Sequence, residues 1–455
     1  MPEPISMYRK GGYHPIDIGD VFRDRYRVFD KLGHGTFATV WLVEDILLRQ
    51  FAAFKVHVAE VLSLPNRGVA ETVVSRHLKE YQEQNPDAFG AEHVVKILDL
   101  FEIHGPNGTH SCIVTELLGP NLNCDQVIYY EEDYDQDSFP IDIARQMCAQ
   151  IARGLVYLHN CGIVHGDLHK GNVLLYRQWS SEKIRKYFGK PRYDELTSFV
   201  PTPHMPKRLV RHWKPQKDLF LSSADVVHVK VCDFSEAFLT TATPQLPFRR
   251  LGTPLPYCAP EVIFHGITLP GPPTDIWALA VLFYMLRYHN TPLFSSDHGR
   301  NAETTLIREM VGKLGKLPPQ WWDRLAERKE IDDEDGPPGR VEMPEPPPKW
   351  WARWTNSRKK LYREDGPPRR WNAKLLPKWW ARWVSRNEFR DEDGPDGEED
   401  LLILFILESS APMEESVTFD RLIQQMVRYE MSERITAEEV VHSLPRIWTG
   451  PVPKD

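Results

Sequence analysis

One short stretch, residues 163–175 (IVHGDLHKGNVLL), constrains the fold of this chain more than any other. A long amphipathic pattern over residues 141–159 predicts a helix directly before it, and the apolar residues at its end predict a buried strand. The polar residues between them therefore form a short loop that regular structure holds at both ends. Asp167 and Asn172 are the two side chains of this loop best suited to carry out chemistry.

The spacing of Asp167 and Asn172 is typical of the catalytic loop of a phosphotransferase. In such a loop the carboxylate accepts or orients the proton of an attacking hydroxyl, and the amide holds a magnesium ion. A polar turn, in which both side chains cap backbone groups, is the alternative interpretation. The length of the whole pattern favours catalysis, so Asp167 is the predicted base and Asn172 a predicted metal ligand.

A glycine-rich turn lies near the N-terminus. Apolar residues predict a strand on each side of it, and glycines let backbone amides approach and cradle phosphate groups. A plain hairpin is the alternative interpretation of the same residues. The turn and its flanks are Leu32, Gly33, His34, Gly35, Thr36, Phe37, Ala38, Thr39 and Val40.

Lys55 lies near the end of an apolar strand, where an ammonium group is costly to bury without a partner. Its aliphatic stem could also carry the charge out to solvent. The helical pattern that follows offers Glu71 as a partner, with Glu80 as the competing candidate. We expect a Lys55–Glu71 ion pair, which would hold the ammonium against the phosphates of a nucleotide.

The helix that carries Glu71 is expected over residues 69–84. Strands are expected around residues 94–101 and 111–117, and residues 275–287 are apolar nearly all round, which predicts a buried helix. The apolar face expected for the first helix consists of Val73, Val74 and Leu78.

Three acidic residues beyond the predicted catalytic loop have expected roles. Asp233 ends an apolar strand in the segment VKVCDFS, where a second magnesium carboxylate is needed. Glu261 needs a buried cation as its partner, and Arg434 is the candidate. Asp275 opens the buried helix and would cap that helix or brace the backbone of the catalytic loop.

These motifs occur in the order of the protein kinase set, so the chain resembles a protein kinase over about residues 20–450. The segments GGYHPIDIGD, RY, KLG and TVWL, within residues 11–42, are similar to the SR-protein kinase family in its fungal form. The resemblance implies an α+β, bilobal fold. A β-rich, ATP-binding N-lobe (20–117) would follow an N-terminal extension (1–19), and a helical, catalytic C-lobe (118–455) would complete it.

The resemblance implies ATP- and Mg²⁺-dependent phosphorylation of serine or threonine in protein substrates, which in this branch are basic, Arg/Ser-rich splicing proteins. It also assigns roles to single positions. The glycine turn would cover ATP, Lys55 and Glu71 would pair, and Asp167 would be the base. The remaining roles are adenine contact by Ala53 and Leu174, the gatekeeper Thr115, hinge backbone bonds at Glu116 and Leu118, and magnesium binding by Asn172 and Asp233.

Four residues depart from the kinase pattern. Ala38 replaces a third glycine, and the family often has a small residue there. Gly166 replaces an arginine that meets a phosphorylated activation loop, which predicts activity without that phosphorylation. His169 replaces a lysine that neutralises the γ-phosphate, and a neutral imidazole is a weaker clamp. Ser235 replaces a glycine and restricts the backbone at the conformational switch.

Two other functions stay open at this stage. A chain with these departures could be a pseudokinase that binds basic partners without transferring phosphate. The order HGDLHxGN is also the loop style of aminoglycoside- and choline-type small-molecule kinases. Glu261 and Arg434 belong to kinases with protein substrates and favour that class, with Asp167, Asn172, Lys55 and His169 as the catalytic set.

Composition adds exclusions. The net charge is −8, which argues against direct binding of nucleic acid. The longest apolar run, residues 401–407, is shorter than the ~20 residues of a membrane-spanning helix. The N-terminus has no secretory pattern, and the six cysteines form no CxxC pair. We therefore expect a monomer of the cytoplasm or the nucleus, or of both, without membrane contact.

Two insertions lengthen the expected C-lobe. Residues 176–227 are polar, contain prolines and show no clear periodicity. Residues 317–400 contain nine of the 14 tryptophans, in three Trp-Trp units that begin at Pro319, Pro348 and Pro377 and precede acidic Gly-Pro turns. Duplication of one helix–turn unit is the favoured interpretation. An aromatic and basic docking surface is the alternative.

Overall fold

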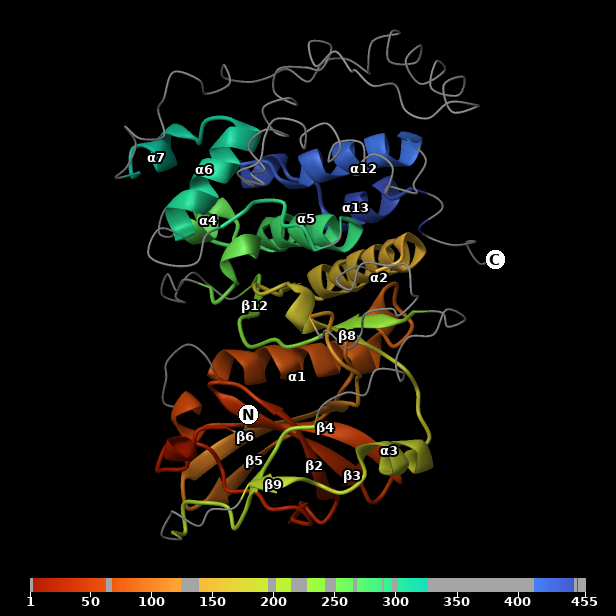
Figure 1. Ribbon diagram of the computed structural model, residues 1–455, viewed down its shortest axis with the longest axis vertical. Helices are drawn as coiled ribbons and strands as arrows, with labels where there is room; N and C mark the ends of the chain where they lie inside the picture. Colours follow the sequence, from red (N-terminus) through yellow and green to blue (C-terminus); the bar gives the residue numbers. More distant parts are fainter. Residues whose placement is uncertain are drawn as a thin grey trace, which may run out of the picture. The chain divides into compact units, whose positions relative to one another are not determined.

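The computed structural model describes the chain in ten ranges and one further residue (Figure 1). Residues 1–295 and 414–455 belong to one compact unit, and residues 296–413 to a second. Each unit is described by itself. The described ranges are 3–62, 68–123, 139–194, 202–213, 227–241, 251–264, 268–288, 290–296, 302–325 and 413–445, together with Trp448.

The first unit contains a six-stranded antiparallel sheet in the order β1-β2-β3-β4-β6-β5. Its glycine turn joins two long, directly paired strands, as the apolar alternation predicts. Side chains alternate between the two faces of the sheet, so Trp41 and Phe54 pack together on one face while Ala53 and Lys55 point to the other. The strands are β1 (Val21–Phe22), β2 (Tyr26–His34), β3 (Ala38–Asp45), β4 (Gln50–His57), β5 (Ile97–Gly105) and β6 (Gly108–Glu116).

Helix α1 (Gly68–Gln84) has the position that its sequence predicts. Val74 and Leu78 are buried, at 2% and 0% exposed, but Val73 is 43% exposed. The prediction for Val73 is wrong because a helix turns by about 100° per residue, which leaves only one of two adjacent valines on the buried face.

Helices and short paired strands form the other lobe of the first unit (Figure 1). Helix α2 (Ile141–Asn160) leads into the catalytic-loop segment, and α5 (Pro272–Arg287) is buried along nearly its whole length, as predicted. Strand β7 pairs with β12, and β8 pairs with β11. The remaining elements are β7 (Ile163–Val164), β8 (Val173–Leu175), β11 (Val229–Val231), β12 (Phe238–Leu239), α4 (Pro260–Ile263), α12 (Met413–Met426) and α13 (Ala437–Ser443).

Several single-turn 3₁₀ helices connect these elements. One of them, η4 (Lys170–Asn172), contains the predicted metal ligand and follows Asp167 directly in the loop. The others in the first unit are η1 (Ile5–Met7), η2 (Ala59–Leu62), η3 (Ala91–His93), η5 (Leu255–Tyr257) and η7 (Met431–Glu433).

The insertion at 176–227 contains regular structure that its sequence does not reveal. It forms α3 (Ser181–Phe188), with Ser180 as the N-cap, and the pair β9 (Tyr193–Asp194) and β10 (Leu209–Val210). We call residues 179–194 and 202–213 the strap, because they pack against the β-rich lobe. The sequence shows no clear period here, since the apolar residues of this segment are too few and too far apart, yet the segment contains these regular elements.

The strap contacts both faces of the sheet. Ile184 and Phe188 of α3 pack with Leu42 and Phe51, whereas Val210 of β10 belongs to the core on the opposite face. Backbone hydrogen bonds add to this packing, including one from the Trp213 amide to the Lys31 carbonyl at 2.8 Å. The segment that follows the predicted catalytic loop in sequence therefore stabilises the β-rich lobe.

The second unit contains α6 (Ala302–Leu314) and α7 (Pro319–Trp322) among its described residues. The first Trp-Trp unit forms α7, and Trp321 and Trp322 are both buried. The second and third units and the apolar run at 401–407 lie outside the described residues. Across the described part of the chain, none of the helices has the length and apolar character needed to cross a membrane.

Candidate active site

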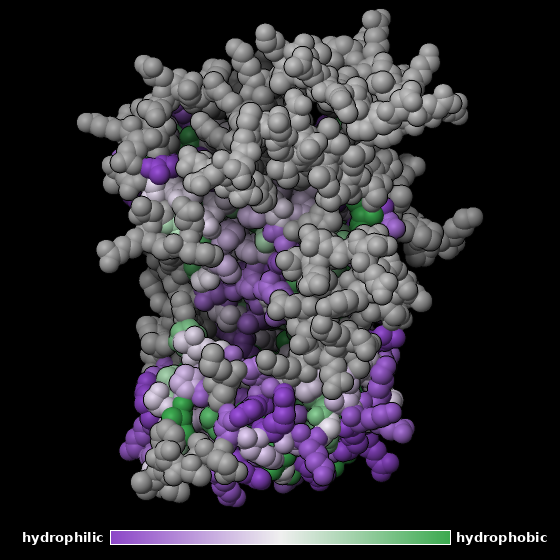
Figure 2. Space-filling model, viewed as in Figure 1, coloured by the Kyte–Doolittle hydropathy of each residue, from purple (hydrophilic) through white to green (hydrophobic). Residues whose placement is uncertain are grey.

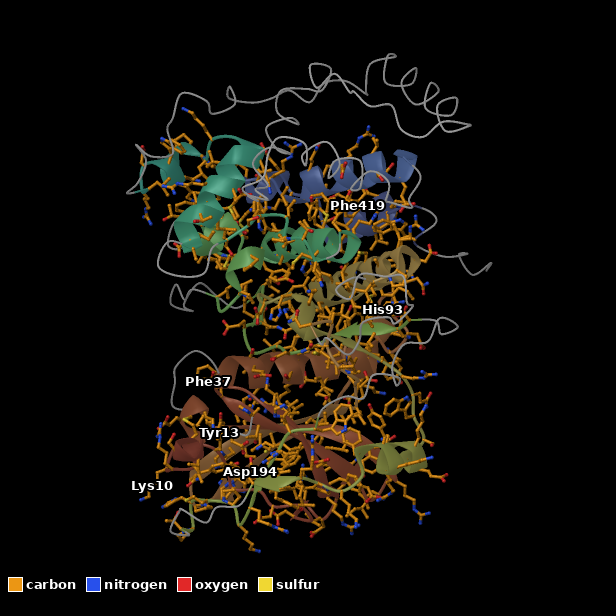
Figure 3. The ribbon with its side chains drawn as sticks, viewed as in Figure 1. Lys10, Tyr13, Phe37, His93, Asp194 and Phe419 are labelled. Carbon is orange, nitrogen blue, oxygen red and sulfur yellow. The ribbon has the colours of Figure 1, made fainter. Side chains whose placement is uncertain are left out.

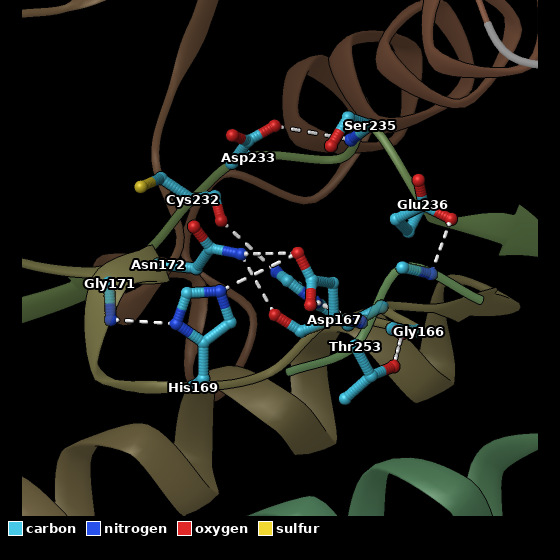
Figure 4. A network of polar contacts seen from close by, with 12 residues as sticks. Gly166, Asp167, His169, Gly171, Asn172, Cys232, Asp233, Ser235, Glu236 and Thr253 are labelled. Atoms are coloured by element: carbon cyan, nitrogen blue, oxygen red, sulfur yellow. Dashed lines mark hydrogen bonds and ion pairs between the residues drawn. The ribbon is translucent and has the colours of Figure 1, made fainter. Parts of the chain in front are cut away.

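The predicted catalytic loop brings Asp167 and Asn172 into direct contact (Figure 4). The side-chain nitrogen Nδ2 of Asn172 donates to the backbone carbonyl of Asp167 at 2.8 Å and to its Oδ2 at 3.1 Å. The other carboxylate oxygen, Oδ1, is buried and has no hydrogen-bond partner in the described structure. A buried acceptor without a partner is costly in free energy.

Asp275 fixes the backbone of this loop from beneath. Its two carboxylate oxygens accept from the amides of His165 and Gly166, each at 2.8 Å, and one of them also contacts His159 Nε2 at 3.0 Å. Asp275 is 1% exposed. Of the two roles considered for this residue, the structure therefore shows bracing of the loop.

His165 connects the loop to the strand that carries the second acidic residue. Its Nδ1 accepts from the Asp167 amide at 3.2 Å, so its Nε2 carries the hydrogen and donates to the Cys232 carbonyl at 3.1 Å. The residue before Asp233 is thus tied to the residues around Asp167.

His169 lies beside Asp167, where the resemblance expects a lysine. Its Nδ1 accepts from the Gly171 amide at 2.9 Å and caps η4, while its Nε2 lies 3.6 Å from Asp167 Oδ2. An imidazole whose Nδ1 accepts a hydrogen bond carries its proton on Nε2. His169 therefore presents a neutral donor towards the catalytic carboxylate in place of a full positive charge.

Lys55, Glu71 and Asp233 form a continuous ion-pair network across the two lobes. Lys55 Nζ lies 2.7 Å from Glu71 Oε1 and 2.9 Å from Asp233 Oδ1. Burial would lower the pKa of Lys55, but the carboxylates of Asp233 and Glu71 outweigh burial and raise this pKa. Burial would likewise raise the pKa of Asp233, yet Lys55 holds it well below its usual range. All three groups are charged at neutral pH.

The backbone at Asp233 is in the left-handed region, with φ of 65°. A non-glycine residue in this region is uncommon and costs free energy, which structures tolerate mainly at functional sites. The amide of Ser235 donates to Asp233 Oδ1 at 3.2 Å and helps to hold this conformation. Ser235, which departs from the kinase pattern, is therefore compatible with the orientation of Asp233 toward Lys55.

The glycine turn projects from β2 and β3 as predicted, with Gly35 and Thr36 exposed. The structure adds a contact that the sequence reasoning did not assign. The hydroxyl of Tyr13 donates to the Gly35 carbonyl at 2.5 Å, and Tyr13 and Phe37 belong to one apolar cluster (Figure 3). The N-terminal GGYHP segment, used above only as a family signature, thus supports the turn.

Two of the residues expected around the nucleotide, Ala53 and the gatekeeper Thr115, are neighbours in the strand register. Ala53 of β4 pairs with Thr115 of β6, and Glu116 ends that strand. Glu116 Oε1 accepts from Lys230 Nζ at 2.6 Å and from the Lys96 amide at 2.7 Å, which fixes the start of the connection between the lobes. Ala53, Thr115, Leu118 and Leu174 are each partly exposed, as residues lining a binding site would be.

The backbone geometry at position 166 explains why a glycine stands where the kinase pattern has an arginine. Its φ is +73°, and a Cβ at this position would lie 2.7 Å from the carbonyl oxygen of Glu236. Thr253 Oγ1 donates to the Gly166 carbonyl at 2.7 Å, and Glu236 Oε2 accepts from the Gly252 amide at 3.0 Å. A side chain at position 166 is excluded unless the segment around Glu236 shifts.

Glu261 and Arg434 form the expected buried pair. Arg434 donates from two nitrogens to the two oxygens of Glu261, each at 2.7 Å, and both side chains are 0% exposed. Thr274 and the Pro273 carbonyl complete the bonds of this pair. Such a planar, bidentate arrangement is the strongest form of ion pair. It fixes the segment that contains Glu261.

The residues present fit a magnesium ion at the predicted position. Both hydrogen bonds of the Asn172 side chain are donated by Nδ2, which leaves Oδ1 as the acceptor for a cation, and Asp233 supplies an ionised carboxylate. Hard oxygen ligands of this kind suit magnesium. No cluster of three or more His, Cys, Asp or Glu side chains suited to a metal occurs among the described residues. The space-filling view shows a hollow with hydrophilic side chains near the centre of the molecule (Figure 2).

A family model described as "Protein kinase domain" matches residues 26–187 and 211–444 of this chain. The match covers most of the chain and contains the catalytic loop, the ion-pair network and the Glu261–Arg434 pair. The chain therefore belongs to the protein kinase family.

Three relatives illustrate where the similarity lies. The chain is 39% identical over 171 residues to SRSF protein kinase 3 of Homo sapiens and 38% identical over 175 residues to protein kinase dsk1 of Schizosaccharomyces pombe. These matches cover 37% and 38% of this chain and only 28% and 30% of those relatives. A serine/threonine protein kinase of Aspergillus fumigatus is 28% identical over 349 residues, which are 75% of this chain and 78% of that relative. The expected similarity to SR-protein kinases is confirmed.

Proposed function

We propose that this protein kinase uses ATP and Mg²⁺ to phosphorylate serine, or threonine, in basic Arg/Ser-rich proteins. The observation that carries the proposal is the orphaned Asp167 Oδ1 beside the Lys55–Glu71–Asp233 network. A proton acceptor and a phosphate-binding cation are thus present together with metal-binding oxygens. The name of the Aspergillus fumigatus relative supports the serine/threonine class, and the similarity to SRSF protein kinase 3 supports the basic substrate.

In the proposed reaction the substrate hydroxyl donates its proton to Asp167 while its oxygen attacks the γ-phosphorus. The bond from the γ-phosphorus to the β,γ-bridging oxygen breaks, and ADP leaves with that electron pair. Lys55, fixed by Glu71, orients the α- and β-phosphates, and the glycine turn covers them. Mg²⁺ held by Asn172 and Asp233 supplies charge neutralisation on the phosphates.

His169 has a narrower role in this proposal. Its Nε2–H is directed to Asp167 and so orients the base, but it supplies no full charge to the γ-phosphate. We infer that transfer of the γ-phosphate is slower than it would be with a lysine at this position. In the same proposal Ala53 and Leu174 contact adenine, Thr115 is the gatekeeper, and the backbone at 116 and 118 binds the edge of the adenine ring.

The proposed protein is a monomer of the cytoplasm or the nucleus, without nucleic-acid or membrane contact.

A comparison of acceptors tests this substrate class. The purified chain is incubated with labelled ATP, Mg²⁺ and one of three acceptors: an Arg/Ser repeat peptide, the same peptide with glutamate for arginine, or an amino alcohol such as choline. We expect transfer to serine in the basic peptide alone. Transfer to choline in its place would assign the chain to the small-molecule kinases, and ATP binding without transfer to any acceptor would indicate a pseudokinase.

A further inference from the structure

His57 is a buried histidine in the ion-pair region to which the account above assigns no role. It lies on β4 two residues after Lys55 and is 2% exposed. Its Nε2 lies 2.7 Å from Glu71 Oε2, and its Nδ1 lies 3.1 Å from the Ser111 carbonyl oxygen. The glutamate that pairs with the phosphate-binding lysine therefore has a second partner.

The strand geometry explains why both partners reach the same carboxylate. Side chains two residues apart on a strand point to the same face, so Lys55 and His57 both project toward α1. Glu71 divides its oxygens between them: Oε1 contacts Lys55 and Oε2 contacts His57. The carboxylate is held at both ends and cannot turn about its own axis without losing one bond.

The partners of His57 fix the positions of its hydrogens. Burial would raise the pKa of Glu71, but Lys55 and His57 outweigh burial and lower it, so this carboxylate is ionised and only accepts. The Ser111 carbonyl also only accepts. Each ring nitrogen of His57 therefore faces an acceptor, and Nε2 is placed to donate to Glu71.

A second contact ties the start of α1 to the same place on the sheet. Thr72, next to Glu71, contacts the Ser111 hydroxyl through its Oγ1 at 2.8 Å. On the other side of His57, His110 Nδ1 contacts the His57 carbonyl at 2.8 Å. The first turns of α1 are thus attached to β4 and β6 by bonds that involve no residue of the 233–261 segment.

We propose that His57 is a positioning residue of the phosphotransfer site, which holds Glu71 against β4 and thereby holds Lys55 in the orientation that phosphate binding requires. The proposal rests on the proposed function and extends it to the control of α1. Helix α1 is then held in its active position by the sheet itself, through a donor that neither the Lys55–Glu71 pair nor the glycine turn supplies.

Three substitutions of His57 separate positioning from space-filling. His57→Gln places an amide nitrogen near the position of Nε2 and can keep the bond to Glu71. His57→Asn places its amide near Nδ1 and can keep only the bond to Ser111, while His57→Met fills the space with neither. Because a hydrogen bond to a charged group is lost, His57→Asn and His57→Met should lower kcat roughly 10- to 100-fold. Both should change KM for ATP by less than about threefold. Gln should retain kcat within about threefold.

The role depends on Glu71, and this dependence gives a second readout. In a Glu71→Ala background, His57→Met should cause no further loss of kcat, since the acceptor of the contact is already removed. His104→Gln is the matched control, because His104 is an exposed histidine of the same sheet, and it should leave kcat unchanged. Equal losses for His57→Gln and His57→Asn, or full additivity with Glu71→Ala, would overturn the positioning role.

A measurement independent of turnover distinguishes this proposal from the proposed function. Nitrogen NMR of histidine-labelled full-length protein should show a hydrogen on Nε2 of His57 at neutral pH, and Glu71→Ala should shift the signal of that nitrogen. If the wild type transfers no phosphate but shows this signature, the kinase function fails and the assignment of His57 stands. A His57 without a hydrogen on Nε2 in an active wild type would overturn the assignment and leave the kinase function intact.

Discussion

At the scale of single residues, the candidate site consists of the Asp167–Asn172 contact and the Lys55–Glu71–Asp233 network. Asp167, Asn172 and Lys55 are identifiable because their spacing follows from fixed loop and strand geometry. The Lys55–Glu71 pair is also identifiable, since the helix after the strand offers Glu71 near its start, with Glu80 as the competing candidate. Their roles in binding and transfer remain predictions that the geometry supports.

His57 and Tyr13 could not be identified in this way. Each acts through a partner distant in sequence, Glu71 Oε2 for His57 and the Gly35 carbonyl for Tyr13. A single buried histidine or tyrosine carries no spacing signal, and its partner depends on which face of the sheet it occupies. The pattern K-x-H on a strand that faces a glutamate is the signal that could have indicated His57.

His169 provides a residue-scale prediction about the missing catalytic-loop lysine. His169→Lys should raise kcat several-fold, because a full positive charge would then face the transferred phosphate. It should also lower the free energy of unfolding by about 1 kcal/mol, since the cap on the Gly171 amide is lost. Initial rates at saturating ATP and urea unfolding measure the two effects.

His169→Asn is the matched control for that variant. Asparagine is a favourable N-cap, so stability should be retained, but the donor to Asp167 is lost and kcat should fall. A higher kcat for His169→Asn than for His169→Lys would contradict the role assigned to Nε2.

At the scale of elements, the regular sheet, α1 and α2 could be predicted from their periodic patterns, and α5 from its continuous apolar character. The strap could not be predicted, because its apolar residues are few and their partners lie far away in sequence. Ile184 and Phe188 are about 140 residues from Leu42 and Phe51, the residues they cover, as the 141-residue separation of the Arg185–Glu44 pair illustrates. No local period records a contact of that kind.

The strap gives an element-scale prediction. Trp213 packs on Phe188, with ring centroids 4.6 Å apart, and its amide bonds to β2. Because the ring is partly buried, Trp213→Ala should lower the free energy of unfolding by about 1–3 kcal/mol and increase hydrogen exchange in β3 and β4. Urea denaturation and exchange mass spectrometry measure both effects.

Arg211→Ala is the control within the same strap. Arg211 is exposed and pairs with Asp194 at the surface, where ion pairs contribute little, so no measurable change is expected. Unaltered exchange in β3 and β4 for Trp213→Ala would show that the strap does not stabilise the β-rich lobe.

At the scale of the whole molecule, two insertions make the chain longer than a single catalytic unit. The strap folds onto the first unit, whereas the Trp-Trp repeats fall within residues 296–413, which form the second unit. Only the first repeat lies among the described residues, as α7, so the choice between duplicated helices and a docking surface remains a prediction. The sequence could locate the repeats but not the way in which they pack.

Asp420 gives a prediction about stability and pH. Burial raises its pKa to about 6, and its Oδ1 is 3.4 Å from the Tyr288 hydroxyl. Between about pH 4 and 6 the Asp420 carboxyl of the folded protein therefore holds a proton that the unfolded chain, with a pKa near 3.9, has already released. Stability is lost as pH rises through that window, and the cost is fully present above it.

Asp420→Asn removes this cost. The variant should exceed the wild type in free energy of unfolding by roughly 1–3 kcal/mol at pH 7.5, and by less than half as much at pH 4.5. Urea unfolding at the two pH values measures the difference. A difference that stays constant with pH would show that Asp420 does not titrate as described.

The central claim is that Asp167 accepts the proton of a serine hydroxyl while phosphate is transferred from ATP. The most direct measurement is the initial rate of phosphate transfer to an Arg/Ser peptide by the wild type and by Asp167→Asn, at equal concentration and with ATP binding shown for both. The account predicts serine phosphorylation by the wild type and a loss of roughly 10²- to 10⁴-fold in the variant. Equal rates for the two proteins, or no transfer by a wild type that binds ATP, would contradict it.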